Sequence, residues 1–198
     1  MTLLITSLIR KTTLFLVAAT LSVSAMAAEL SQIQREANQG DAQAQAFLGA
    51  IYAQGEGVRQ DYSKSAQWFE KSANQGNAGA QFILGSMYAR GNGVRQDYFK
   101  AKQWLEKSAN QGNADAQYAL GAIYAQGEGV RQDYSKSAQW FEKSANQGNA
   151  GAQFILGSMY ARGDGVRQDY AVAKEWFGKS CDNGDQDGCD SYRKLNQR

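Results

Sequence analysis

The hydrophobic and polar positions of this chain recur with a fixed period. The segment GxGVRQDY occurs four times, 36 residues apart, at residues 55–62, 91–98, 127–134 and 163–170. A longer block, residues 48–91, recurs without change as residues 120–163, which indicates that a two-repeat unit was duplicated. Self-similarity at this period is typical of folds that stack one small structural unit many times. One repeat can therefore be analysed for all of them.

The first part of each repeat has the pattern of an amphipathic helix. In the first copy the apolar stripe follows a 3.6-residue period and consists of Ala44, Leu48, Ile51 and Tyr52. Asp41 stands where a side chain caps a helix N-terminus, and Gly55 stands where a left-handed residue ends a helix. The other copies place Asn77, Asn113, Asn149 and Asp185 at the capping position.

A second helix is predicted after the glycine-rich turn. Asp61, Asp97, Asp133 and Asp169 are its expected N-caps, and the stripe expected to face inward in the first copy is Tyr62, Ser65, Trp68, Phe69 and Ser72. A lysine such as Lys71 falls in the last turn, where a cation suits the helix dipole.

These patterns predict about ten short helices in antiparallel pairs. A single pair cannot bury its apolar face, whereas stacked pairs share a continuous core, so the expected fold is an all-α solenoid. We expect one domain over residues 28–198, with a half-repeat cap at 28–40, repeats at 41–76, 77–112, 113–148 and 149–184, and a cap helix at 185–198.

The first 27 residues have the pattern of a secretory signal peptide. Arg10 and Lys11 precede the apolar stretch 14–23, and small residues at Ala25 and Ala27 predict cleavage after Ala27. An N-terminal membrane anchor is the alternative, but the apolar run is shorter than the ~20 residues that a spanning helix needs. We expect a periplasmic or secreted protein with no stable membrane insertion after cleavage.

Composition removes several classes of function. The chain has 21 basic and 19 acidic residues, and the segment after Ala27 has 19 of each, so no basic excess indicates nucleic-acid binding. The absence of His excludes Ser-His-Asp and Cys-His catalysis and His-ligated metals, and two Cys cannot complete a zinc site. The chain is expected to need no metal and no cofactor.

The repeat resembles the Sel1-like repeat, with the pattern A-x3-LG-x2-Y-x2-G-x-GV-x2-D-x2-KA-x2-W. The first copy carries it on Ala44, Leu48, Gly49, Tyr52, Gly55, Gly57, Val58, Asp61, Lys64, Ser65 and Trp68. Ser65 and Ser137 replace the usual Ala, and Val172 replaces the Lys. The resemblance implies a right-handed superhelix that serves as a scaffold for protein or peptide partners, with bacterial secreted members linked to host interaction, periplasmic signalling or envelope assembly.

Two cysteines lie near the C-terminus, Cys181 at the end of a second helix and Cys189 early in the cap helix. Antiparallel helices joined by a short turn can bring such a pair within bridging distance, so a disulfide is the leading interpretation in an exported chain. Two free buried thiols and a redox pair are the alternatives, and the spacing differs from that of a redox CxxC. The eight-residue spacing also resembles the cysteine-rich branch of the family.

The expected binding surface lies on the first helices, which line the concave side in superhelices of this kind. Aromatic and arginine side chains on such a surface are typical binding anchors. The candidates are Phe82, Tyr118 and Phe154 at one position, and Gln54, Arg90, Gln126 and Arg162 at another. The alternative for the aromatic residues is that they pack between neighbouring repeats.

A catalytic interpretation rests on one short motif. Ser191 and Lys194 match the S-x-x-K of penicillin-recognising enzymes, but the chain has no S-D-N or K-T-G partner motif. The favoured hypothesis is a non-enzymatic scaffold that binds proteins through its concave face. A weak penicillin-binding or β-lactamase-type hydrolase and a passive structural spacer are the alternatives.

Overall fold

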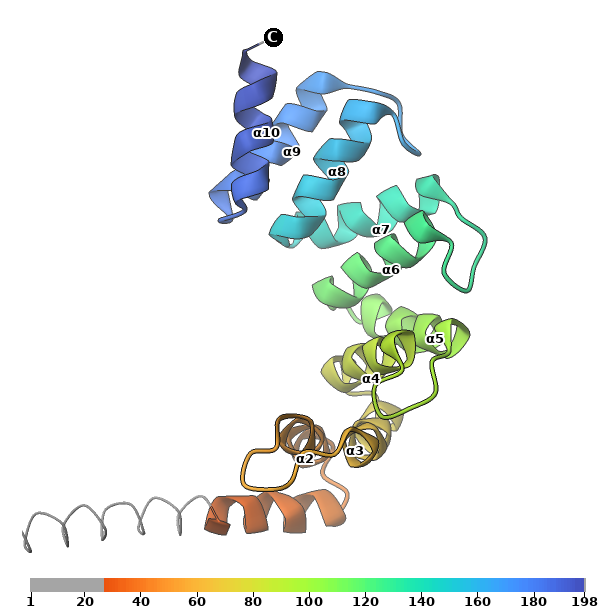
Figure 1. Cartoon of the computed structure of the whole chain (residues 1–198), viewed down its shortest axis with the longest axis vertical. Helices are drawn as coiled ribbons and strands as arrows, with labels where there is room; N and C mark the ends of the chain where they lie inside the picture. Colours follow the sequence, from red (N-terminus) through yellow and green to blue (C-terminus); the bar gives the residue numbers. More distant parts are fainter. Residues whose placement is uncertain (1–26, 198) are drawn as a thin grey trace, which may run out of the picture.

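The computed structural model describes residues 27–197 and shows a curved row of helices (Figure 1). Residues 27–38 are helical, and no strand occurs in the described range. Helix pairs then follow as α2 (Ala42–Gln54), α3 (Tyr62–Asn74), α4 (Ala78–Arg90), α5 (Tyr98–Asn110), α6 (Ala114–Gln126), α7 (Tyr134–Asn146), α8 (Ala150–Arg162) and α9 (Tyr170–Asp182), with α10 (Gln186–Asn196) last. The predicted all-α solenoid is confirmed.

The predicted signal peptide lies outside the described residues except for Ala27, the first of them. Cleavage after Ala27 therefore stays a prediction. None of the helices in the described part of the chain is both long and apolar enough to cross a membrane.

The helix ends form as the sequence predicts. The Asp41 carboxylate accepts a hydrogen bond from the Ala44 N–H at 2.6 Å, and the Asp61 carboxylate accepts one from the Lys64 N–H at 2.9 Å. Gly55 ends α2 in the left-handed conformation with φ of 78°. Because the same caps recur in the later copies, each repeat contributes helices of 13 residues.

The core runs along the whole row between the helices. Its fully buried side chains include one leucine from each first helix, at Leu48, Leu84, Leu120 and Leu156. Phe69, Phe141 and Phe177 of the second helices pack beside them. The prediction that Tyr62 faces inward is wrong, since its side chain is 45% exposed. Tyr62 is the first residue of α3, and its hydroxyl is within 3.2 Å of Gln60 Nε2 at the surface.

The tryptophans are half-buried and not fully enclosed. Trp104 packs against the core cluster formed by α3 and α4. The Lys107 ammonium lies 4.0 Å from the centroid of its ring, and the other three repeats have the same pair. Each lysine therefore covers an aromatic face while it also neutralises the C-terminal end of its helix.

A chain of glutamine side chains joins successive repeats. Gln81 is buried, and its Nε2 donates to the Ala73 carbonyl at 3.0 Å. Its Oε1 accepts from Gln111 Nε2 at 2.7 Å, which belongs to the next second helix. Gln45, Gln117 and Gln153 make the same bonds to carbonyl oxygens. Because both ends of each buried amide are satisfied, this network fixes the register of neighbouring repeats at little desolvation cost.

Candidate functional site on the concave face

The first helices provide the inner surface of the arc. Figure 1 shows α2 and α4 nearer the inner side of the curve than α3 and α5. One position of these first helices is occupied by Phe47, Ile83, Ala119 and Ile155 in successive repeats. Phe47 is 53% exposed, so α2 offers apolar surface to solvent there. Ile83, Ala119 and Ile155 are half-buried and pack against the core clusters.

A first pocket lies between residues 27–38 and α2, with a volume of about 620 Å³. Leu30, Ile33, Phe47 and Ile51 form its apolar wall. Its polar rim consists of Glu29, Gln34, Gln54 and Glu56. Gln54, a predicted partner-binding residue, is therefore placed at a cavity.

A second pocket, of about 260 Å³, lies one repeat further along, between α3 and α4. Phe69, Ile83 and Met87 line it at the positions that Ile33, Phe47 and Ile51 occupy in the first pocket. Arg90 and Asn92 line it at the positions of Gln54 and Glu56. The two pockets are thus the same structural feature in consecutive repeats, with different polar groups at the rim.

The three predicted aromatic anchors pack partly into the core. The Tyr118 ring lies 5.4 Å from the Phe141 ring in an edge-to-face contact, and the Phe154 ring lies 5.7 Å from that of Phe177, so both contacts join the two helices of one repeat. Phe82 packs against a core cluster of α5 and α6 and also lines the second pocket. All three are half-buried. Their role in binding stays a prediction.

The four predicted polar residues are the last residues of their helices, and all are exposed. Gln54 and Arg90 line the two pockets, whereas Gln126 is the equivalent residue of α6. Arg162 Nε lies 2.6 Å from Asp164 Oδ2 and forms an ion pair with it. Arg90 has Asn92 at the equivalent position and makes no ion pair within the described residues. The two arginines therefore differ in charge environment.

Phe47 and Ile83 were not among the predicted site residues. Both lie outside the apolar stripe of the first helix, and Phe47 is exposed whereas Ile83 packs partly against the core. Such off-stripe apolar residues are a sequence signal for an exposed contact surface.

The structure joins Cys181 and Cys189 in a disulfide, with their Cα atoms 4.5 Å apart. Cys181 lies in the last turn of α9 and Cys189 in the first turn of α10. Free thiols, one of the alternatives, do not occur within the described residues. The bond ties the terminal helix to the preceding one, at the end of the row where α10 has a neighbour on one side only.

We expect a Cys181→Ser/Cys189→Ser variant to lose stability chiefly in α10. Closure of so short a loop contributes about 2–3 kcal/mol by chain entropy, so amide exchange in residues 186–196 should become faster while α4–α7 stay protected. Hydrogen exchange with mass spectrometry measures both regions. Alkylation of the unreduced wild-type protein serves as the control, and a mass gain at either cysteine would contradict the disulfide.

The pKa shifts of the described residues each have a separate physical cause. A hydrogen bond from Lys102 to Glu106 raises the pKa of the Lys102 amine. Hydrogen bonds from Gln186 and Arg193 lower the pKa of the Asp190 carboxyl. Burial and the neighbouring Glu128 carboxylate raise the pKa of the Tyr98 hydroxyl. These groups do not form one constellation of the kind that acid-base catalysis requires.

The S-x-x-K motif lies on α10 with no catalytic surroundings in the structure. Ser191 is half-buried and Lys194 is exposed, and the pocket between α9 and α10 is lined by Tyr192. Within residues 27–197, no group of three Cys, Asp or Glu side chains is placed to hold a metal ion.

The fold and the inner surface define a helical-repeat solenoid with a row of contact pockets. The family model of the Sel1 repeat matches residues 42–77, 78–113, 114–149 and 150–185, so the chain belongs to the Sel1 repeat family. Proteins of this family generally act as protein-interaction scaffolds. The comparison with curated protein sequences gave no match.

Three solved structures show the same architecture. A protective antigen of uropathogenic Escherichia coli with an SLR fold is 39% identical over 81% of this chain and 34% of its own, with a TM-score of 0.79. A Sel1 repeat protein from Oxalobacter formigenes is 36% identical over 84% of this chain and 48% of its own, with a TM-score of 0.76. Cysteine rich protein B of Helicobacter pylori is 26% identical over 69% of this chain and 98% of its own, with a TM-score of 0.54. This chain thus spans less than half the length of the first two.

Proposed function

We propose that this chain is an exported, non-enzymatic scaffold that binds a protein or peptide partner on its concave face. The observation that carries this proposal is the recurrence of one pocket in consecutive repeats, at equivalent positions of α2 and α4. Apolar cavities with a few polar groups at the rim are the usual form of a binding site. Spaced along a curved surface, they suit a partner that contacts several repeats at once.

Two features support this assignment over catalysis or a passive spacer. The polar side chains at the two pockets are amides, hydroxyls, the carboxylates of Glu29 and Glu56, and Arg90, and among the described residues neither pocket combines a carboxylate with a basic side chain. Phe47 exposes half of its side chain at the mouth of an apolar pocket with a polar rim, which is the usual form of a binding site. Export rests on the signal-peptide pattern of residues 1–27, and N-terminal sequencing of the processed protein tests it.

Site-specific photo-crosslinking tests the binding face. We expect a photoreactive phenylalanine analogue at position 47 to capture a partner in living cells, because this side chain lies at a pocket and is accessible. The same analogue at position 99 is the matched control, since Phe99 is 62% exposed but lies in the first turn of the second helix α5.

The captured partner is then purified and its affinity measured for two variants. Phe47→Ser is expected to weaken binding by about tenfold, as loss of an apolar anchor does at many interfaces, while Phe99→Ser leaves it unchanged. Equal capture at positions 47 and 99, or equal affinity of the two variants, would show that the partner does not use the concave face.

A further inference from the structure

We propose that the second pocket recognises an extended peptide in which an apolar side chain is next to an acidic side chain, with the carboxylate paired to Arg90. This inference rests on the proposed function and assigns the partner's chemistry at that same face. It follows from a difference in polar contacts between two duplicated blocks of the chain, residues 48–91 and 120–163.

The duplicated block gives an internal comparison. Residues 48–91 and 120–163 are identical, so Arg90 and Arg162 end identical helices. The next residue that differs is Asn92 in the first copy and Asp164 in the second. Asp164 pairs with Arg162, whereas Asn92 has no charge to offer Arg90. Within residues 27–197, only in the first copy is the guanidinium at this position therefore free of an internal carboxylate that competes with an external one.

A second polar group at this pocket also differs between the copies. Ser65 Oγ is fully buried at the pocket wall and has no hydrogen-bond partner. Its duplicate, Ser137, donates to the Gly121 carbonyl at 2.8 Å. In the first copy, the Arg90 guanidinium has no ion pair and the Ser65 hydroxyl has no hydrogen-bond partner within the described part of the chain. In the second copy, the equivalent groups of Arg162 and Ser137 both have a partner.

The apolar part of the ligand follows from the pocket lining. Phe69, Phe82, Ile83 and Met87 enclose a space of about 260 Å³ beside Arg90, so an apolar side chain fits there while the neighbouring acidic group reaches the guanidinium. Arg forms two parallel hydrogen bonds to a carboxylate, which makes it selective for an acidic residue over an amide.

The first pocket sets the direction of the peptide. Its rim has the Glu56 carboxylate, which forms no ion pair within residues 27–197, whereas cleavage after Ala27 would place a new amino terminus beside Glu29. A peptide that places its carboxylate at Arg90 is therefore expected to place a basic residue over the first pocket. Charge complementarity of this kind fixes orientation more than it adds affinity.

The experiment selects a phage library of random 12-residue peptides on the mature protein, residues 28–198. Enriched peptides are expected to have an acidic residue beside an apolar one, with a basic residue at the other end. Their affinities are then compared among four proteins, the wild type, Arg90→Gln, Asn92→Asp and Arg162→Gln. Asn92→Asp keeps the fold intact, because Asp stands at the equivalent position 164.

We expect Arg90→Gln to weaken peptide binding by about tenfold, since it removes one charge-assisted contact. Asn92→Asp should weaken binding by about two- to fivefold, since it supplies an exposed carboxylate that competes for Arg90. Arg162→Gln should change it less than twofold. Enriched peptides without an acidic residue, no enriched peptide at all, or equal effects of Arg90→Gln and Arg162→Gln would overturn the inference. If these results coincide with capture at position 47 and not at 99, the concave face still binds a partner and only the assigned peptide chemistry is wrong.

Discussion

Replacement of Gly93 by alanine is expected to lower the free energy of unfolding by about 3 kcal/mol or more. Gly93 lies in the turn before α5 with φ of 69°, a left-handed conformation that costs alanine about 1–2 kcal/mol. An added Cβ would also lie 2.0 Å from the carbonyl oxygen of Tyr62, at the start of α3 in the preceding repeat. Because that atom belongs to the backbone, the turn must move away from α3, and such overpacking adds about 1–3 kcal/mol.

The chain offers a matched control for this substitution at Gly57. Its φ is also 69°, but an added Cβ would meet only a Leu30 methyl group, at 3.6 Å. Gly57→Ala should therefore cost about 1–2 kcal/mol, the conformational part alone. Urea unfolding followed by circular dichroism measures both variants. If both variants lose the same free energy of unfolding, the close contact between Gly93 and the preceding repeat does not add to the cost of a side chain at position 93.

The contact at Gly93 also explains how the repeats are coupled. The turn of each repeat docks on the start of the second helix before it, and the Ser63 hydroxyl donates to the Gly93 carbonyl at 3.2 Å. Two repeats later the same contact recurs, since a Cβ added at Gly165 would lie 2.3 Å from the carbonyl oxygen of Tyr134. The pockets of the concave face depend on this docking, since the second pocket is lined by residues from α3 and α4 together.

The sequence predicted the helices because their determinants are local. Capping residues such as Asp41 and left-handed glycines such as Gly55 act within one turn of chain, so their pattern alone sets where helices begin and end. The exposure of Tyr62 was not predicted, because a helical stripe does not show how far the neighbouring helix extends over a terminal residue. The buried role of Gln81 was missed for a related reason, since both of its partners belong to other helices.

The candidate site could be predicted in part. Arg90 and Gln54 were singled out because arginine and amide side chains recur at one helix end, and both line pockets, while their role in binding stays a prediction. The difference in ion pairing between Arg90 and Arg162 depends on residues 92 and 164, which a search restricted to repeating positions overlooks. The aromatic candidates were harder to place, because a residue such as Phe154 has the same spacing along the chain whether it faces a groove or packs against the partner helix of its own repeat.

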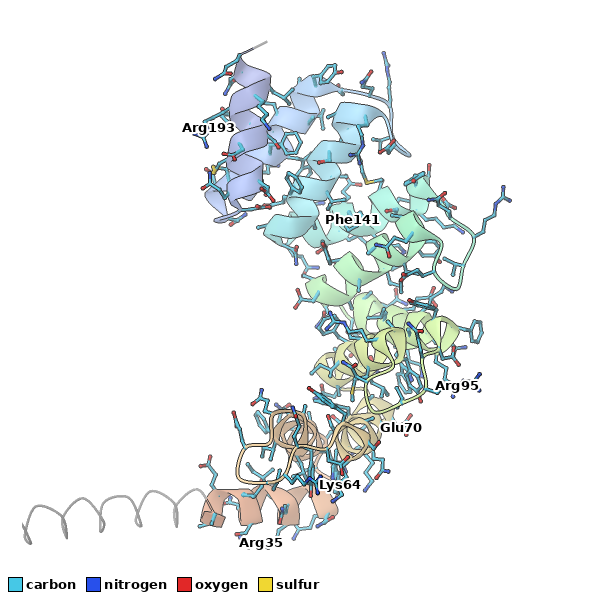
Figure 2. The ribbon with its side chains drawn as sticks, viewed as in Figure 1. Arg35, Lys64, Glu70, Arg95, Phe141 and Arg193 are labelled. Atoms are coloured by element: carbon cyan, nitrogen blue, oxygen red, sulfur yellow. A yellow bond between two sulfur atoms is a disulfide. The ribbon has the colours of Figure 1, made fainter. Side chains whose placement is uncertain are left out.

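Replacement of Phe141 by alanine is expected to cost about 3–5 kcal/mol, the range for large aromatic truncations in a core. Phe141 lies between neighbouring helices in the middle of the row (Figure 2) and is 3% exposed. Its ring fills the space over Gly121, where an added Cβ would lie 2.8 Å away, and it meets the Tyr118 ring edge-on. Alanine leaves a cavity that helices fixed by their own caps close only in part.

Phe99→Ala is the control for Phe141→Ala, because it removes the same atoms from a side chain that is 62% exposed. Its expected cost is within about 0.5 kcal/mol, as for most surface substitutions. Since each repeat is coupled mainly to its neighbours, the Phe141→Ala loss should also appear as faster amide exchange in α6–α8 before it spreads to α2. A uniform increase in exchange from residue 42 to residue 196 would instead mean that the row unfolds as one unit and that its repeats have no independent stability.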